Sequence, residues 1–410
     1  MPAAARNQAH HPLSNPAVLA TVVAMFIGFS GVGSMLPILP LFLRDHAIDP
    51  AQAGLIVAAA WLAQFLGQYP AGRLSDRIGP KPVFIGGLLL EAVGVAAFLI
   101  PFGAPWLLAW RLLQGLGSAA YLPASRAAVA AETPPEQLGT AYSYLTGAHI
   151  GGFVAGPAAG GLLALLGRDA VFAATAAALV FAAGMVLLLV TATRPGNAPV
   201  AAGPGAAPPP RGLRRSRPLR GAASLAAGEG LLAGIYLIVW SLYMQDIGAA
   251  DWQIGASFSL WAAPAVLLTP VSGWAADRYD RRWLSVGAIA FQGAIAPIYP
   301  LLRSVPPIYA LSVVEGSSAV LGEAPINAYL MDAVAPDQRG AAQGVVGAVN
   351  SGTMALGSAA GGVLYSFGQP VPFAVGGAAC VICALLAIPF LRRRPVAAAA
   401  VAQPWTPSSP

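Results

Sequence analysis

The residues best able to do chemistry are acids that lie inside long apolar stretches of the sequence. These acids are Glu91, Glu229, Glu315 and Glu323. Desolvation in a membrane favours the neutral form of a carboxyl group, whereas the arrival of water or a cationic neighbour favours the ionised form. A group that changes between these forms binds and releases a proton. We therefore predict a proton-coupling role for the four glutamates, against the alternative that each is structural.

One basic side chain, Arg111, also lies inside an apolar stretch. A guanidinium group within a membrane span usually faces the bundle interior or a cavity. There it stabilises the charge of a nearby carboxylate and disfavours a cationic substrate, so we predict that Arg111 tunes proton coupling. The alternative is that Arg111 snorkels to the nearer membrane surface, about four or five residues away.

The elements that must position these side chains are membrane spans. Hydrophobic residues make up 57% of the 410 residues and charged residues only 9%, against about 25% charged residues in soluble proteins. A helix crosses the hydrocarbon with about 20 apolar residues, and the sequence has twelve such stretches. They cover residues 17–43, 51–72, 83–102, 106–131, 139–165, 170–192, 219–244, 253–275, 284–302, 307–333, 340–366 and 370–391. We predict an all-α membrane protein with twelve transmembrane helices.

The second set of six spans repeats the first at an offset of 201 positions. The pairs related by this offset include Gly72 and Gly273, Asp76 and Asp277, Arg77 and Arg278, and Gly156 and Gly357. Parallel repeats about an axis normal to the membrane occur in transporters. The repeat therefore predicts two pseudo-symmetric six-helix bundles, residues 17–192 and 219–391, around a central cavity.

Basic residues divide unevenly between the two sides of such bundles. Even-numbered spans place both termini on one side, and eighteen Lys and Arg residues fall on that side against three on the other, Arg44, Arg168 and Arg303. The positive-inside rule then predicts that both termini are cytoplasmic. The remaining segments are a cytoplasmic N-terminus (1–16), a flexible cytoplasmic linker (193–218) and a disordered cytoplasmic tail (392–410). The Ala-, Gly- and Arg-rich composition indicates a GC-rich bacterial source, and hence the inner (plasma) membrane.

The polar segment Gly72-x-Leu74-Ser75-Asp76-Arg77-x-Gly79-x-Lys81 resembles the signature between spans two and three of the major facilitator superfamily. The segment from Gly273 to Arg282 resembles its weaker counterpart, so the resemblance implies the major facilitator fold over all twelve spans. Glycine at position 72 allows close helix approach, Asp76 can cap a helix N-terminus, and Arg77 can pair with a carboxylate. We predict a conformational latch, against the alternative of a plain polar turn. The latch residues are Gly72, Asp76, Arg77, Gly273, Asp277 and Arg278.

A glycine-rich motif in the fifth span, Gly152-x-x-x-Gly156-Pro157-x-x-Gly160-Gly161, resembles motif C of the drug:proton antiporters in this superfamily, which implies export. Glycines spaced every four residues share one helix face, and Pro157 permits a bend. We predict that the face of Gly152, Gly156 and Gly160 packs tightly against a helix of the other half. A generic small-residue face of a membrane bundle is the alternative.

The fourth span carries Arg111-Leu112-Leu113-Gln114-Gly115, which resembles motif B of the same family, whose arginine is linked to proton movement. Many drug antiporters also carry an acid in the first span, where this sequence has none. Glu229, which mirrors Gly28 of that span, is therefore our first choice as proton carrier. His149 shares the helix face of Gly152 and Gly156, and we favour a packed histidine over a proton relay. The residues predicted to line the substrate cavity are His149, Gln114, Trp240 and Tyr243.

Other kinds of functional site are absent from the sequence. It has no P-loop, nucleophile constellation or metal-ligand cluster, and Cys380-x-x-Cys383 has no second pair and no neighbouring His, which favours inert packing. We therefore expect no enzyme activity, cofactor, metal or nucleic-acid partner. The expected protein is a monomer in the lipid bilayer.

The resemblance implies a transporter that exports a small amphipathic or lipophilic compound in exchange for protons by alternating access. One alternative is an exporter or facilitator of sugars or other metabolites without proton coupling. A second alternative is a membrane receptor or scaffold with the same fold and no transport.

Overall fold

The computed structural model describes residues 11–100, 103–191, 216–335 and 338–391, and every regular element in these ranges is helical. Residues 1–10, nearly all of the predicted linker and the predicted tail 392–410 lie outside the described residues. The predictions made for those segments therefore stay predictions.

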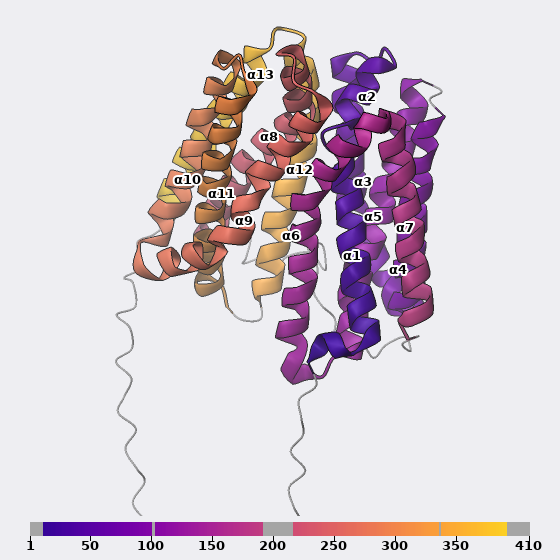
Figure 1. The fold of residues 1–410 in the computed structure, drawn as a ribbon. Helices are drawn as coiled ribbons and strands as arrows, with labels where there is room; N and C mark the ends of the chain where they lie inside the picture. Colours follow the sequence, from indigo (N-terminus) through magenta and orange to yellow (C-terminus); the bar gives the residue numbers. More distant parts are fainter. Residues whose placement is uncertain (1–10, 101–102, 192–215, 336–337, 392–410) are drawn as a thin grey trace, which may run out of the picture.

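Twelve long helices, six in each half of the described chain, form two groups that Figure 1 shows side by side. The N half contains α1 (Pro16–Met35), α3 (Pro50–Ile78), α4 (Pro80–Ala96), α5 (Ala104–Glu132), α6 (Leu138–Leu163) and α7 (Arg168–Leu189). The C half contains α8 (Arg217–Asp246), α9 (Asp251–Arg278), α10 (Arg281–Ile295), α11 (Val305–Ala333), α12 (Arg339–Tyr365) and α13 (Pro370–Ala387). A short helix, α2 (Leu39–Asp45), follows α1.

Nine helical segments of the described ranges are long and apolar enough to cross a membrane by length and composition. The three long helices outside that criterion are α5, α11 and α12. Each of them contributes polar residues to the interior of the molecule, among them Arg111, Glu315 and Ser351. The helices with the weakest apolar character are thus among those that build the site.

The first predicted span, 17–43, is not one helix. α1 ends at Met35 and α2 begins at Leu39, with Pro37 between the two helices. Proline has no backbone N–H and clashes with the carbonyl four residues earlier, so it interrupts a helix interior. Pro40 is tolerated because it lies within the first two positions of α2, where the missing N–H has no helical partner. The length of the apolar run predicted one span, and it does not register the break at Pro37.

The second span is longer than predicted, because α3 continues through the polar segment to Ile78. Asp76 therefore lies in the last turn of α3, and the prediction that it caps a helix N-terminus is wrong for this structure. α4 begins instead after Gly79, whose φ of 92° is accessible to glycine without strain. In the C half the corresponding cap is an acid, since Asp280 accepts a hydrogen bond from the backbone N–H of Arg282 at 3.0 Å.

The halves meet mainly through two helix pairs, α3 with α12 and α6 with α9, and α8 also contacts α2 and α3. The contact is closest at the end of the molecule that carries residues 44–50 and 246–251, here called the closed end. Figure 1 shows the halves separating toward the opposite end, which carries residues 76–81 and 277–282 and is here called the open end.

Candidate functional site

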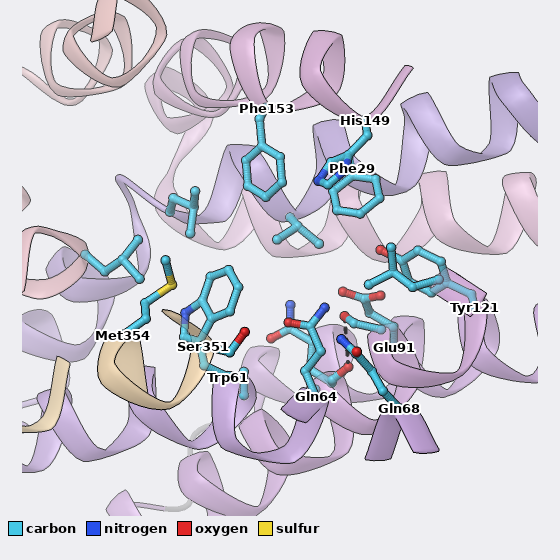
Figure 2. Close-up of a pocket in the computed structure, with 18 of the residues that line it drawn as sticks. Phe29, Trp61, Gln64, Gln68, Glu91, Tyr121, His149, Phe153, Ser351 and Met354 are labelled. Atoms are coloured by element: carbon cyan, nitrogen blue, oxygen red, sulfur yellow. Dashed lines mark hydrogen bonds between the residues drawn. The ribbon is translucent and has the colours of Figure 1, made fainter. Parts of the chain in front are cut away.

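A cavity of about 630 Å³ lies between the two halves. Its walls come from α1, α3, α4, α5 and α6 of the N half and from α8, α9, α11 and α12 of the C half. Aromatic side chains from both halves line it together with aliphatic ones, and acids, arginines and amides are interspersed. Figure 2 shows part of the wall, with Phe29, Trp61 and Phe153 around the space and Glu91 beside Tyr121. Such a mixture of apolar surface with a few polar groups is typical of small-molecule sites.

Close packing of α4 on α5 positions the polar groups of the N half. A Cβ atom at Gly94 would lie 2.8 Å from the backbone N of Gln114, and one at Gly117 would lie 2.5 Å from the backbone N of Glu91. Without side chains at these glycines the helices approach closely and bring Glu91 next to Arg111 and Gln114. Arg111 donates a hydrogen bond to the side-chain carbonyl of Gln114.

Arg111 lies inside the protein and does not snorkel. It is 3% exposed, and both Arg111 and Gln114 line the cavity. Glu91 is 0% exposed and lines the same wall. The structure thus brings together three residues that the sequence had nominated separately.

The acid of the C half that faces the cavity is Glu315, which is 1% exposed. It accepts a hydrogen bond from the hydroxyl of Tyr299 at 2.6 Å. The Tyr243 hydroxyl donates to the backbone carbonyls of Tyr299 and Leu302, both at 2.5 Å, and so fixes the segment that carries Tyr299. Tyr243 is fully buried in the C-half core and does not line the cavity, which corrects the prediction made for it. Tyr243 lies only three residues after Trp240, which does line the cavity, but the hydroxyl of Tyr243 is bound to backbone carbonyls inside the core.

Trp240 lines the cavity, with its indole N–H donating to the hydroxyl of Ser257 at 2.8 Å. His149 also lines it, and its ring packs on Phe29 with 3.8 Å between centroids and on Phe153 with 5.3 Å. The histidine is thus part of an aromatic stack at the cavity wall.

The other two glutamates, Glu229 and Glu323, are not among the residues that line this cavity. Glu229 lies on the α8 face of Ala233 and Trp240, which do line it, but closer to the open end. Glu323 is exposed on α11, and its carboxyl group interacts electrostatically with that of Glu229. The structure therefore divides the acids into a cavity pair, Glu91 and Glu315, and an open-end pair, Glu229 and Glu323.

The glycine motif of α6 contacts two different helices through two faces. A Cβ atom at Gly152 would lie 2.7 Å from Cβ of Phe29, and one at Gly156 would lie 2.5 Å from the carbonyl of Ser30. Gly160 likewise packs on Ser34. All three contacts are with α1, so the prediction that this face packs against the other half is wrong. Helical spacing identified the face but not which neighbour it meets.

The adjacent face of α6 forms the seam between the halves. A Cβ atom at Gly161 would lie 2.8 Å from the carbonyl of Asp251, and Pro157 lies against Gly255 of α9. The backbone N–H of Ala158 donates to the hydroxyl of Ser259 at 3.0 Å. Ala158 directly follows Pro157 in the sequence. The second half of the motif, around Pro157 and Gly161, thus makes the inter-half contact.

Ion pairs join the halves at the closed end. Arg168 of the N half binds both carboxylate oxygens of Asp251 of the C half, at 2.9 Å each, and also pairs with Asp45 at 2.6 Å. Arg44 pairs with Asp246 at 2.7 Å and donates to Gln245 at 2.9 Å. We name this set, consisting of Arg44, Asp45, Arg168, Gln245, Asp246 and Asp251, the closed-end lock.

From the sequence, Arg44 and Arg168 indicated only the topology, and their contacts were not predicted. A signal was present, because Arg44 and Gln245 lie 201 positions apart, as do Asp45 and Asp246. Polar residues repeated at the ends of matching spans therefore marked these positions, although the repeat does not say which residues meet.

The predicted latch residues at the open end are not joined to each other. Asp76 and Arg77 are exposed, and no described atom lies within 4 Å of a Cβ placed at Gly72 or Gly273. In the C half the ionic contacts of this segment come from Arg281, which pairs with Asp277 at 3.3 Å and with Asp332 at 2.5 Å. Arg278 instead lies over the ring of Trp274. That these residues form a latch when the open end closes therefore stays a prediction.

Several solved structures have a similar fold at low sequence identity. A bacterial homolog of the human lysosomal transporter Spinster, in an inward-facing and occupied conformation, superposes with a TM-score of 0.76 over 93% of this chain and 96% of that chain at 14% identity. The nucleoside transporter NupG gives 0.75 over 92% and 100% at 14% identity. A D-xylose-proton symporter gives 0.71 over 93% and 98% at 15% identity.

Two bacterial proteins resemble part of the sequence. The quinolone resistance protein NorA of Staphylococcus aureus is 27% identical over 143 residues, which are 35% of this chain and 37% of NorA. Multidrug resistance protein 2 of Bacillus subtilis is 31% identical over 135 residues, 33% of this chain and 34% of that protein. The matched part thus spans about a third of each relative. The sequence model of the Major Facilitator Superfamily, in contrast, matches residues 21–239 and 222–408. With this match over nearly the whole chain and a multi-pass helical fold, the protein belongs to the Major Facilitator Superfamily and is a membrane transporter rather than an enzyme.

Proposed function

We propose that this protein exports small amphipathic or lipophilic compounds, of the kind called drugs, in exchange for protons. The observation that carries the proposal is the pair of buried acids, Glu91 and Glu315, one from each half, which face a single aromatic cavity. Acids in a membrane interior are costly and mark proton or substrate pathways. The partial matches to resistance proteins named for quinolones and multiple drugs support the substrate class.

The conformation supports alternating access as the mechanism. The closed-end lock and the α6–α9 seam shut the cavity on one side, while its lining reaches Arg73, Asp76 and Arg126 toward the open end. The excess of basic residues on the side of the termini assigns the open end to the cytoplasm. The structure then corresponds to the state that collects substrate from inside a bacterial cell, with both termini cytoplasmic in the inner membrane. The whole cavity is built by one chain, so a monomer suffices.

Glu315 is the acid to which we assign the proton. Its contact with Tyr299 keeps one oxygen occupied in this state, and a rearrangement of the halves changes its access to water. A ligand shifts a conformational equilibrium only as far as it binds the two states differently, and a titrating acid at the cavity wall supplies that difference. Protonation and substrate binding then favour opposite conformations. The open-end pair, Glu229 and Glu323, is positioned to exchange protons with the cytoplasm.

The test is transport by the purified protein in liposomes under imposed pH gradients. Efflux of a fluorescent aromatic drug should increase with an opposing proton gradient, and Glu315→Gln should transport at a rate that no longer depends on the gradient. Glu229→Gln changes an acid of the same half outside the cavity lining, and it should slow proton exchange with the cytoplasm without abolishing the dependence on the gradient. Equal rates with and without the gradient in the unmodified protein would favour an uncoupled facilitator instead.

A further inference from the structure

The two halves carry the same pair of buried polar groups with acid and amide exchanged. Glu91 on α4 corresponds to Gln292 on α10, and Gln114 on α5 corresponds to Glu315 on α11, at the 201-position offset of the repeat. All four side chains are buried. Each half therefore has one carboxyl and one carboxamide at matching places, with the acid on the earlier helix in the N half and on the later helix in the C half.

The two acids differ in their contacts. Glu315 accepts a hydrogen bond from Tyr299 at 2.6 Å. Among the described residues neither oxygen of Glu91 has a hydrogen-bond partner of good geometry, although Ser118, Gln114 and Tyr121 all lie beside it. A buried polar group left without a partner costs free energy, and more so when it is charged. Glu91 is thus the cavity acid whose carboxyl oxygens are available to accept hydrogen bonds from a ligand.

Two further polar atoms near Glu91 also lack partners in the described part of the chain, Nε of Arg111 and the hydroxyl of Tyr121. Both side chains are buried and line the cavity. Figure 2 shows Glu91 beside Tyr121, with the side chains of Gln64 and Gln68 close by. This wall therefore presents a free carboxyl acceptor and a guanidinium donor next to one another.

The charge of the cavity wall argues against a lone cation as the ligand. The lining acids are Asp76, Glu91 and Glu315, and the lining arginines are Arg73, Arg111 and Arg126. A cleft concentrates ions of one sign when its own charges are of the other sign, and here the signs balance. Next to Glu91 the guanidinium of Arg111 repels a cation that approaches the carboxylate.

We propose that the cluster of Glu91, Arg111 and Tyr121 binds the polar group of the substrate, and that this group presents a hydrogen-bond donor and an acceptor side by side without net charge, as carboxamides and ureas do. The donor faces Glu91 and the acceptor faces Arg111. The flat apolar body of the substrate lies against Phe29, Trp61 and Phe153. The inference rests on the transport function proposed above, and it assigns recognition to the N half while the proton stays with Glu315.

The experiment compares three probes that share a naphthalene body. 2-Naphthamide has both donor and acceptor, N,N-dimethyl-2-naphthamide keeps only the acceptor, and 2-naphthyltrimethylammonium carries a lone positive charge. Their affinities for the purified full-length protein in nanodiscs are measured by calorimetry. We expect 2-naphthamide to bind most tightly.

Two substitutions separate the donor from the acceptor contact. Glu91→Leu should weaken 2-naphthamide about tenfold, the size of one hydrogen bond to a charged group, and leave the dimethyl amide within twofold. Arg111→Met should weaken both amides. Glu315→Gln, which mimics the protonated acid, should change all three affinities by a similar factor and leave their order unchanged, although it removes the dependence of transport on the pH gradient. The outcome for recognition is therefore read independently of the outcome for proton coupling.

Thermal unfolding of the variants tests whether a loss of binding comes from a damaged fold instead of a lost contact. Because Glu91 is a buried carboxyl without a partner, Glu91→Leu should unfold at a midpoint no lower than that of the unmodified protein. Three results would overturn the proposal. These are tightest binding of the trimethylammonium probe, equal loss of both amides in Glu91→Leu, or a clearly lowered unfolding midpoint of that variant.

Discussion

Removal of Arg168 should release the closed end of the molecule. In this conformation its Nε and one terminal nitrogen each lie 2.9 Å from a different oxygen of Asp251. The two residues belong to opposite halves, so the contact must break when the closed end opens. The Asp45 contact of the same arginine stays within the N half, because α2 and α7 both belong to it. Of the two ion pairs that Arg168 makes, only the one with Asp251 therefore biases the conformational equilibrium.

The size of the effect follows from burial and geometry. The side chains of Arg168 and Asp251 are 16% and 20% exposed, so the pair is partly shielded from water. Hydrogen bonds to charged groups contribute about 1.5–3 kcal/mol when buried, and exposed ion pairs about 0–1 kcal/mol. A partly buried bidentate pair lies between these limits, at about 1–2 kcal/mol. Arg168→Ala should then shift the ratio of the two conformations by about 5- to 30-fold.

Pulsed electron paramagnetic resonance measures this ratio directly. Spin labels at Ile78 and Tyr279, which are exposed and symmetry-related at the open end, report its width. The two native cysteines, Cys380 and Cys383, are first replaced by serine. Arg168→Ala should increase the fraction of short distances, because the open end closes as the closed end opens. Asp45→Asn is the matched control and should leave the distribution unchanged. An unchanged distribution in Arg168→Ala, or an equal shift in Asp45→Asn, would refute the reasoning.

Three further predictions concern glycines and the open end. Gly161→Leu should enrich the conformation with the closed end apart, because even a Cβ would lie 2.8 Å from the Asp251 carbonyl; Gly147→Leu, with no described atom within 4 Å, is its control in the same spin-label assay. Gly156→Leu should instead lower the thermal unfolding midpoint, since it forces α1 from α6 inside one half at a cost of about 1–3 kcal/mol; an unchanged midpoint would contradict the packing. Asp76→Asn should leave the midpoint unchanged, because Asp76 is exposed here, yet slow transport in liposomes if it joins a latch in the other conformation. Unaltered transport would argue for a plain polar turn.

The sequence predicted most of the architecture, because apolar length and an internal repeat are local or periodic properties. The twelve helices and their pairing into halves follow from these two signals. The break between α1 and α2 required closer attention to Pro37, which apolar content alone does not register. The continuation of α3 to Ile78, past Pro70 in its interior, shows that neither a polar composition nor a single proline is enough to end a helix.

The candidate site was harder to predict, because its contacts join residues far apart in sequence. Glu91, Arg111 and Gln114 could be nominated because they are polar residues inside apolar spans. Their mutual contact depends on how closely α4 packs on α5. The assignment of Tyr243 to the cavity failed because α8 has more than one buried face. The closed-end lock was visible only as repeated polar residues at the offset of 201, a pattern that indicates matching positions and not which residues meet.

The central claim is that outward movement of substrate is coupled to inward movement of protons through Glu315. Liposomes that contain the protein, an internal pH dye and an aromatic drug are diluted into drug-free buffer, with the membrane potential clamped. Our account predicts that the lumen acidifies as the drug leaves, and that the Glu315→Gln variant releases drug without any pH change. Drug efflux from the unmodified protein at constant internal pH would contradict the account.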